Sequence, residues 1–239
     1  MKKNRLNQIN LPYMVNVNEG GIDKRIVASH NPDAHISEEY RALRTNIFGL
    51  KKSSGLTLVI TSALFREGKT ITAINLALTL AKEPDLKVLL IDSNLRDPQV
   101  HSFLDINSEP GLTDMLLGNR DVQAKIIENL SVLPAGRRVS NPSELLSSSE
   151  MKVLIKGWQS QYDYLILDSP PVISYTDAGI LGGASDGVIL VVAALKTQKD
   201  AVLHTRYLLD NAKAKVSGFI LTKTESFIPK MLRQYYHKF

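Results

Sequence analysis

The segment from Ser62 to Thr70 carries residues whose order could bind phosphate groups. Its end, Gly68-Lys69-Thr70, matches the end of the P-loop pattern, in which a glycine and four further residues precede Gly-Lys-Ser/Thr. In such a loop the backbone N–H groups face the phosphates, the lysine reaches the β and γ oxygens, and the hydroxyl holds magnesium. Ala63 stands where the first glycine belongs, so an ordinary strand-to-helix turn remains an alternative on the motif alone.

Two aspartates strengthen the phosphate-binding interpretation. Asp92 follows the apolar run 89–91, and Asp168 follows the apolar run 165–167. Ligands of open α/β folds bind at the carboxyl ends of the strands, where a carboxylate can hold the magnesium that bridges the phosphates. Either aspartate alone could simply start a turn. Together with the loop, the two aspartates favour a site for ATP and Mg²⁺.

The candidate site residues fall into two groups by their expected role. We expect the nucleotide to contact Leu64, Phe65, Arg66, Glu67, Gly68, Lys69, Thr70 and Ile71. We expect magnesium to be held by Thr70, Asp92 and Asp168.

The segments around these residues alternate between short apolar runs and amphipathic stretches. We expect strands at 56–60, 88–91, 130–133, 164–167, 188–192 and 219–221. We expect helices at 38–50, capped by Ser37, and at 68–81, 150–161 and 200–213. Continuous apolar strands between such helices are typical of a parallel sheet covered on both sides. The sequence therefore predicts an α/β P-loop NTPase fold, with a mostly parallel sheet and helices on both faces.

Length and composition restrict the organisation of the chain. Its 239 residues suffice for one large α/β core but not for two ordinary domains. We expect a P-loop domain at 31–225 between an N-terminal arm at 1–30 and a C-terminal tail at 226–239. The longest apolar run, 187–195, is about half the length of a membrane span, and no signal-peptide core follows the basic N-terminus. These features predict a cytoplasmic protein.

Cysteine content and charge exclude some chemistry and leave the partner open. The chain has no cysteine, which excludes disulfides, thiolate metal sites and a cysteine nucleophile. Its net charge of +5 is dispersed. This charge permits a nucleotide, a nucleic acid or a membrane surface as partner and selects none of them.

Several blocks of the sequence resemble the bacterial tyrosine kinases, P-loop proteins related to the cell-division and partition ATPases. The block 92–98, Asp-Ser-Asn-Leu-Arg-Asp-Pro, is similar to the family's Asp-x-Asp-x-Arg motif. The loop segments 61–64 and 67–70 match the family's phosphate loop, where a first residue other than glycine is usual. Further similar blocks lie at 39–47, 129–136, 141–146 and 162–172. The resemblance thus covers nearly the whole chain, with its blocks in the family's order.

The resemblance implies an ATP-dependent protein-tyrosine autokinase that regulates synthesis and export of capsular polysaccharide or exopolysaccharide. Members transfer the γ-phosphoryl group of ATP to tyrosines of their own C-terminal tail, for which Tyr235 and Tyr236 are the candidates here. The implied catalytic residues are Lys69, which would stabilise the transferred phosphoryl group, and Asp92, which would accept the tyrosine proton.

The resemblance also implies partners and a location. Many members are separate cytoplasmic subunits that a membrane adaptor activates. This implies recruitment to the inner face of the cell membrane by an adaptor of the polysaccharide co-polymerase type. A tyrosine phosphatase is a further implied partner, and nucleic acid is not one.

Charged residues before the first apolar run could form a subunit contact. On an ideal helix Glu38, Arg41 and Arg44 lie within about 120° of one another. They match the Glu-x-x-Arg-x-x-Arg pattern that the family uses for subunit contacts, so the resemblance implies a homo-oligomer, often a ring. The alternative is a solvated charged face with a weak pair three residues apart.

Several departures from the family pattern leave other functions open. Asn94 stands where a second aspartate is usual, and an amide brings neither charge nor basicity. Phe65-Arg66 replaces Pro-Gly, so Arg66 could add a phosphate contact or stiffen the loop. The tail carries two tyrosines where the family commonly has a longer cluster.

Two other functions therefore stay open. One is a nucleotide-dependent scaffold or ATPase subunit of the polysaccharide machinery with weak or no kinase activity. The other is a partition-type ATPase. Such ATPases carry an additional lysine early in the phosphate loop, and Ala63 and Leu64 occupy that region here.

Overall fold

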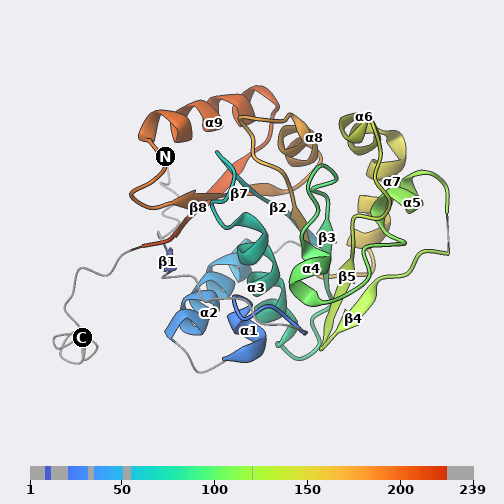
Figure 1. Cartoon of the computed structure of the whole chain (residues 1–239), viewed down its shortest axis with the longest axis horizontal. Helices are drawn as coiled ribbons and strands as arrows, with labels where there is room; N and C mark the ends of the chain where they lie inside the picture. The colour runs from blue at the N-terminus through green and yellow to red at the C-terminus, as the bar shows by residue number, and fades with distance from the viewer. Residues whose placement is uncertain (1–8, 12–20, 32–34, 51–54, 120, 225–239) are drawn as a thin grey trace.

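The computed structural model describes residues 9–11, 21–31, 35–50, 55–119 and 121–224. Within these residues eight strands form one sheet in the order β1-β8-β7-β2-β6-β3-β5-β4, and every neighbouring pair is parallel except β4 with β5 (Figure 1). The strands are β1 (Ile9–Leu11), β2 (Leu56–Ser62), β3 (Val88–Asp92), β4 (Lys125–Ile127), β5 (Leu130–Leu133), β6 (Tyr164–Asp168), β7 (Gly187–Ala193) and β8 (Val216–Thr222).

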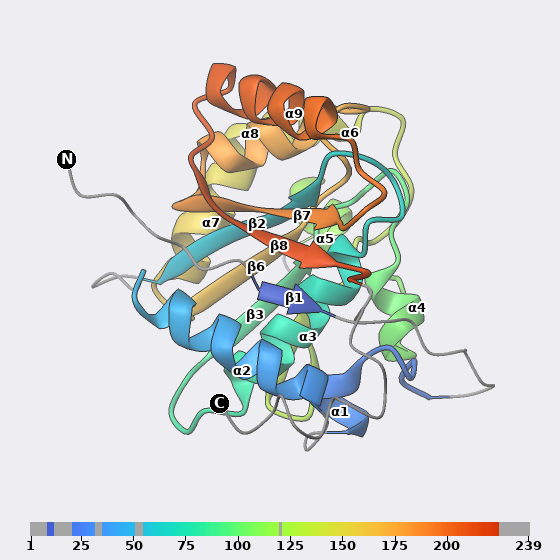
Figure 2. The same ribbon diagram turned by 90° about the vertical axis from the view of Figure 1, so that its left-hand side faces the viewer.

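Helices cover both faces of this sheet, as Figure 2 shows edge-on. The helices are α1 (Val27–His30), α2 (His35–Phe48), α3 (Lys69–Ala81), α4 (Val100–Leu104), α5 (Leu112–Leu116), α6 (Pro142–Ser147), α7 (Ser149–Gln159), α8 (Asp177–Gly183) and α9 (Lys199–Asn211). Helices α1 to α4 enclose one apolar core, and α5 to α9 enclose the other. The expected α/β fold, with a mostly parallel sheet and helices on both faces, is therefore confirmed.

The two cores follow from the alternation of side chains along each strand. In β2, Leu58 and Ile60 lie in the core beneath α3, whereas Val59 lies in the core on the opposite face. All seven residues of β2 are buried, as are all five of β6. Central strands that are covered on both faces consist of continuous apolar residues, and for this reason their positions could be predicted from the sequence.

Every strand and helix expected from the sequence is present, with ends that shift by up to three residues. The elements that the sequence did not indicate are β1, β4, α1, α4, α5, α6 and α8. All of them have only three to seven residues, too few to show a clear hydrophobic period.

The expected role of Ser37 as a helix cap is wrong. Helix α2 begins two residues earlier, at His35, so Ser37 lies inside its first turn. The Ser37 side chain is buried, and its hydroxyl donates a hydrogen bond of 2.6 Å to the carbonyl of Asn31. The serine therefore joins α2 to the end of α1.

Residues 21–30, which the sequence assigned to an arm, include α1, which packs against α3. Ile26 is fully buried, and the backbone N–H of Ala28 donates to Oδ1 of Asn75 on α3 at 2.9 Å. The division into arm, domain and tail stays a prediction. Among the described residues no helix is both long and apolar enough to cross a membrane.

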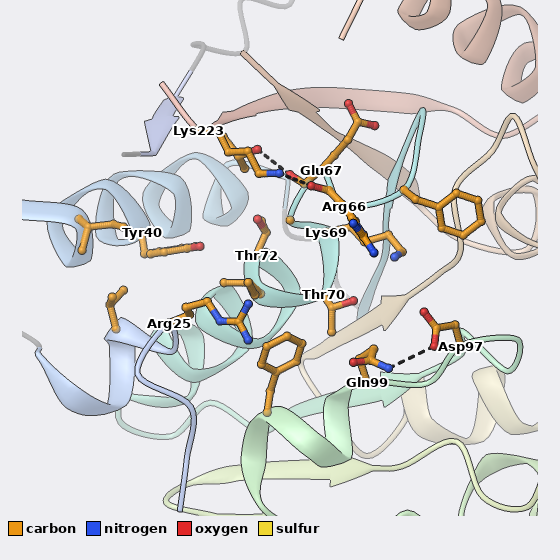
Figure 3. A pocket seen from close by; sticks show the side chains of 17 residues that line it. Arg25, Tyr40, Arg66, Glu67, Lys69, Thr70, Thr72, Asp97, Gln99 and Lys223 are labelled. Carbon is orange, nitrogen blue, oxygen red and sulfur yellow. Dashed lines mark hydrogen bonds between the residues drawn. The ribbon is translucent and has the colours of Figure 1, made fainter. Parts of the chain in front are cut away.

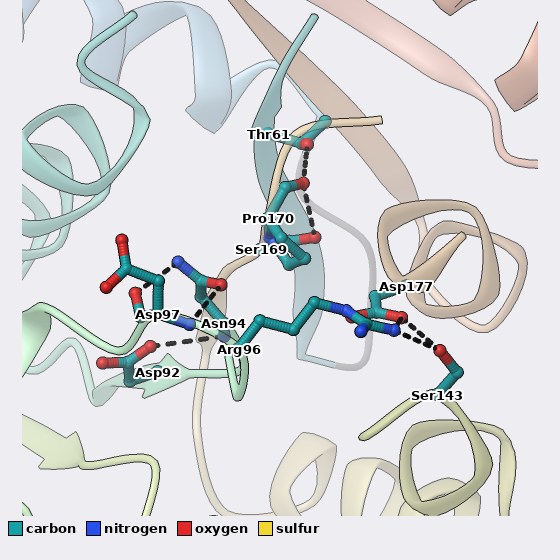
Figure 4. Close-up of polar contacts among 9 residues, drawn as sticks. All are labelled: Thr61, Asp92, Asn94, Arg96, Asp97, Ser143, Ser169, Pro170 and Asp177. Carbon is teal, nitrogen blue, oxygen red and sulfur yellow. Dashed lines mark hydrogen bonds and ion pairs between the residues drawn. The ribbon is translucent and has the colours of Figure 1, made fainter. Parts of the chain in front are cut away.

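A partly buried ion pair connects the loop after β3 to α6 and α8 (Figure 4). The Arg96 guanidinium donates to both carboxylate oxygens of Asp177, at 2.7 and 3.1 Å, and to the hydroxyl of Ser143 at 2.7 Å. The Asp177 side chain is fully buried, and Ser143 also donates to it at 2.6 Å. The guanidinium lies 4.2 Å from the ring centroid of Tyr175. Arg96 therefore connects the loop after β3 to the first turns of α6 and α8.

Replacing this arginine tests how much the ion pair stabilises the fold. Arg96→Ala leaves the buried Asp177 carboxylate without its charged partner, and we expect the free energy of unfolding to fall by about 3 kcal/mol. The control is Arg206→Ala, because Arg206 and Asp210 form an exposed pair worth at most about 1 kcal/mol. Urea denaturation measures both, and equal small losses would contradict a structural role for Arg96.

Candidate functional site

The carboxyl end of the sheet opens into a cavity of about 780 Å³ (Figure 3). Its walls come from the loop between β2 and α3, the first turn of α3, the loop after β3, the end of β8, and the segments around α1, α2 and α4. The lining residues are Arg25, Val27, Ile36, Tyr40, Phe65, Arg66, Glu67, Gly68, Lys69, Thr70, Ile71, Thr72, Asp97, Gln99, Phe103, Thr222 and Lys223. Seven of the eight expected nucleotide contacts are among them, and Leu64 is not.

The phosphate loop is closed by a residue with a left-handed backbone. Gly68 has a φ of +96° and directly precedes Lys69, the first residue of α3. Glycine adopts this conformation without a steric penalty. The turn aims the N-terminus of α3 at the cavity, which favours an anion there.

Glu67 fastens the loop to its surroundings with a buried carboxylate, 3% exposed. One oxygen accepts the backbone N–H of Leu64 at 2.6 Å, and the other accepts the N–H of Ala193 at 3.2 Å and the hydroxyl of Thr197. The hydroxyl of Thr222 donates to the Glu67 carbonyl at 2.6 Å. The loop is thus bound to the ends of β7 and β8, and the Leu64 N–H already has a carboxylate partner.

Thr70 and Asp168 are in direct contact beside Lys69. The Thr70 hydroxyl donates to Oδ2 of Asp168 at 2.8 Å, while Oδ1 of Asp168 is buried with no hydrogen-bond partner among the described residues. Burial raises the pKa of Asp168 to about 6, although the nearby Lys69 and the Thr70 hydrogen bond lower it. A buried carboxylate oxygen without a partner, next to a hydroxyl, fits a hard cation such as Mg²⁺.

Asp92 lies next to Asp168 because the two residues are register partners in β3 and β6. Asp92 is fully buried, and its carboxylate accepts the backbone N–H groups of Asn94, Gln99 and Val100 at 3.2, 3.1 and 3.0 Å. Burial and the Asp168 carboxylate raise the pKa of Asp92 well above its ordinary value. The structure brings Thr70, Asp92 and Asp168 together as expected, but of the three only Thr70 lines the cavity, and both aspartates lie buried behind it.

The Asn94 side chain closes a turn instead of facing the cavity (Figure 4). Its amide nitrogen donates to the carbonyl of Asp97 at 2.7 Å, and its oxygen accepts the Asp97 N–H at 3.4 Å. The turn places the exposed Asp97 at the cavity wall near Gln99, whose amide lies 3.2 Å from the Asp97 carboxylate.

Sequence reasoning did not select several residues of the cavity wall. Asp97 and Gln99 lie in the loop between β3 and α4, so their place in a loop at the carboxyl end of a strand could have indicated them. Lys223 likewise follows β8. Arg25 and Phe103 carry no such signal, because only the packing of α1 and α4 brings them to the cavity.

The expected subunit-contact residues lie on α2. The Arg41 guanidinium donates to the Glu38 carboxylate at 2.7 Å, and Glu38 is largely exposed. Arg44 instead forms an ion pair with Glu83 of its own chain, and its guanidinium lies 5.8 Å from the Phe48 ring centroid. The expected phospho-acceptors Tyr235 and Tyr236 lie outside the described residues.

Comparisons with known proteins agree on one family. A family model described as an AAA domain matches residues 67–207. "Tyrosine-protein kinase YwqD" of Bacillus subtilis is 39% identical over 205 residues, which cover 84% of this chain and 86% of that protein. Among solved structures, the chimerical protein CapA2B2 superposes with a TM-score of 0.82 at 28% identity, covering 92% of this chain and 95% of the other.

A second solved structure is similar to this chain over nearly the same length. The kinase domain of the Escherichia coli tyrosine kinase ETK superposes with a TM-score of 0.81 at 26% identity, covering 93% of this chain and 92% of the other. The chain belongs to the bacterial tyrosine-protein kinases, a family of P-loop nucleotide-binding proteins.

Proposed function

We propose that the chain binds ATP with Mg²⁺ in the cavity and transfers the γ-phosphoryl group to tyrosines of its own C-terminal tail. The observation that carries this proposal is the contact between Thr70 and Asp168 beside Lys69, at a helix N-terminus that opens into the cavity. Relatives named as tyrosine-protein kinases support the choice of reaction.

Each residue of this cluster has a definite role in the proposal. Lys69 contacts the β and γ phosphates and stabilises negative charge on the transferred group. Thr70 and Asp168 hold Mg²⁺, with Asp92 close behind them. A bound Mg²⁺ would supply positive charge that stabilises the negative charge on the phosphates during transfer.

Asp92 is the proposed acceptor of the tyrosine proton. Its oxygens accept three backbone N–H groups of the segment 94–100, so this role requires that segment to release at least one of them. The raised pKa of Asp92 suits a base, because a carboxylate of higher pKa binds a proton more readily.

A nucleotide-dependent scaffold with weak kinase activity is the second candidate. It is favoured by Asn94, whose side chain is occupied in a turn and brings no carboxylate to the cavity. In this case ATP binding alone would control the partners of the protein.

The cellular role is proposed from the family. We propose regulation of capsular polysaccharide or exopolysaccharide synthesis at the inner face of the cell membrane, through a membrane adaptor and with a tyrosine phosphatase that reverses the modification. A ring of subunits would use Glu38, Arg41 and Arg44. The pairing of Arg44 with Glu83 leaves Glu38 and Arg41 as the more exposed part of that contact.

The lysine of the loop provides the first test. Lys69→Ala removes a charged phosphate contact, so we expect ATP affinity to fall by tenfold to a hundredfold, roughly 1.5–3 kcal/mol. The control is Lys152→Ala, which removes an exposed lysine from α7. Calorimetric titration with Mg²⁺ and ATP measures both variants, and equal affinities of Lys69→Ala and the parent would remove the nucleotide site from this loop.

The magnesium ligand can be tested through the pH dependence of stability. The pKa of Asp168 is raised from 3.8 to about 6 by burial. The native state therefore holds a proton that the unfolded state has lost between these values, and stability should fall as pH rises from about 4 to 6.

Asp168→Asn removes this dependence while keeping an oxygen for the Thr70 hydroxyl. At pH 7 with EDTA and no nucleotide, we expect the variant to be more stable by up to about 3 kcal/mol, yet to lose Mg²⁺-dependent ATP binding. Urea denaturation at several pH values measures the first effect, with Asp200→Asn on the exposed face of α9 as control. If the variant is less stable than the parent at pH 7, the buried Asp168 carboxylate does not destabilise the native state, and the prediction is wrong.

The tail decides between kinase and scaffold. Tyr235→Phe combined with Tyr236→Phe keeps both rings and deletes both acceptor hydroxyls, so phosphate incorporation should disappear while ATP affinity is unchanged. Mass spectrometry after incubation with ATP and Mg²⁺ measures the incorporation. Persistent incorporation would exclude the tail as acceptor, and no incorporation in the parent with its adaptor would favour the scaffold.

A further inference from the structure

Arg66 occupies a backbone conformation that a side chain makes costly. Its φ is +61°, in the left-handed region, where the β-carbon crowds the following carbonyl oxygen. Glycine adopts the same conformation freely. An arginine at this position therefore calls for a favourable interaction that compensates the steric cost of its backbone conformation.

The surrounding contacts hold this backbone in place. The Lys223 ammonium donates to the Arg66 carbonyl, and the Thr222 hydroxyl donates to the next carbonyl, that of Glu67, at 2.6 Å. The Glu67 carboxylate in turn accepts the Leu64 N–H at 2.6 Å. The loop is therefore fixed on both sides of Arg66, so the fold sets the direction in which the Arg66 side chain leaves the backbone.

That side chain reaches into the cavity without a carboxylate partner. Arg66 is exposed and lines the cavity together with Lys69, and Figure 3 shows both side chains extending from the same loop. Other arginines pair with a carboxylate: Arg25 with Asp23, Arg41 with Glu38, Arg44 with Glu83 and Arg96 with Asp177. Within the part of the chain that the structure describes, the Arg66 guanidinium forms no ion pair.

The charges at the cavity rim also favour the binding of an anion near Arg66. The pKa of Lys223 is lowered by burial first, and then by the positive charges of Lys196 and Arg66. The Glu67 carboxylate opposes this shift, but its oxygens already accept hydrogen bonds from Leu64, Ala193 and Thr197. The rim thus carries more positive than negative charge, a state that a bound anion would relieve.

We propose that Arg66 is a second phosphate-binding cation, which contacts the polyphosphate of the nucleotide beside Lys69. A guanidinium presents paired N–H donors that match phosphate oxygens, whereas a lysine acts as a single point charge. The backbone cost at φ +61° is then offset when the nucleotide binds. This inference rests on the proposed binding of ATP in the same cavity.

Two substitutions separate a phosphate contact from a stiffening of the loop. Arg66→Gln removes the charge but keeps the β-carbon and therefore the restricted backbone. Arg66→Gly removes both. We expect both variants to bind Mg²⁺ and ATP about tenfold more weakly than the parent, since each loses a charge-assisted hydrogen bond. The melting temperature without nucleotide should be unchanged in the glutamine variant and equal or higher in the glycine variant.

Lys213 provides a matched control. It is an exposed cation with a φ of +57° at the end of α9, and it does not line the cavity. Lys213→Gly removes one positive charge and one left-handed side chain, as Arg66→Gly does, and we expect ATP affinity to stay at the parental value. Isothermal titration measures affinity and thermal denaturation measures stability.

The outcomes are distinguishable. Parental affinity in Arg66→Gln overturns the proposal, and a loss confined to Arg66→Gly means that the residue only stiffens the loop. An equal loss in Lys213→Gly assigns the effect to net charge and also overturns it. If Lys69→Ala binds ATP like the parent in the same titrations, the nucleotide site itself is wrong. A normal loss in Lys69→Ala with no loss in Arg66→Gln removes only the inference about Arg66.

Discussion

Two aspartates lie side by side, fully buried, at the carboxyl end of adjacent parallel strands, and the site is organised around their charge. The register of β3 and β6 pairs Asp92 with Asp168. Two carboxylates in such a position repel each other and are desolvated, so they require donors or cations nearby. The structure supplies backbone N–H groups to Asp92, and it places the Thr70 hydroxyl and the charge of Lys69 beside Asp168.

The two aspartates differ in role because their carboxylate oxygens differ in how many hydrogen-bond partners they have. Both carboxylate oxygens of Asp92 accept backbone N–H groups, whereas one oxygen of Asp168 has no partner among the described residues. The second arrangement suits a metal ligand, because a cation compensates the buried oxygen that the protein leaves unpaired. The first arrangement stabilises the loop after β3, which also contains Arg96 and its ion pair with Asp177.

The same distinction separates the carboxylates that hold the loops from the groups that face the cavity. Glu67 and Asp177 are buried and fully engaged, and they connect the phosphate loop and the loop after β3 to the rest of the domain. Arg66, Lys69 and Asp97 line the cavity. Rigid loops with unsatisfied charges at their tips can bind a charged ligand with little reorganisation, which is the arrangement that phosphoryl transfer needs. Asn94 also serves to hold a loop, because its side-chain nitrogen and oxygen both form hydrogen bonds within the turn.

The sequence alone determined the α/β class, the central strands, the phosphate loop and the aspartates at the strand ends. These features depend on local patterns: apolar runs buried on both faces, a loop motif of fixed spacing, and the rule that ligands bind where parallel strands end. Tertiary structure decided the rest. It placed Ser37 inside α2, brought Arg25 and Phe103 to the cavity wall, and paired Arg44 with Glu83. It also used the Asn94 side chain in hydrogen bonds that close the turn after β3. It left Arg66 at a φ of +61°, with a guanidinium that forms no ion pair among the described residues. Such contacts join segments far apart in the chain, and no local period or spacing encodes which side chains will meet.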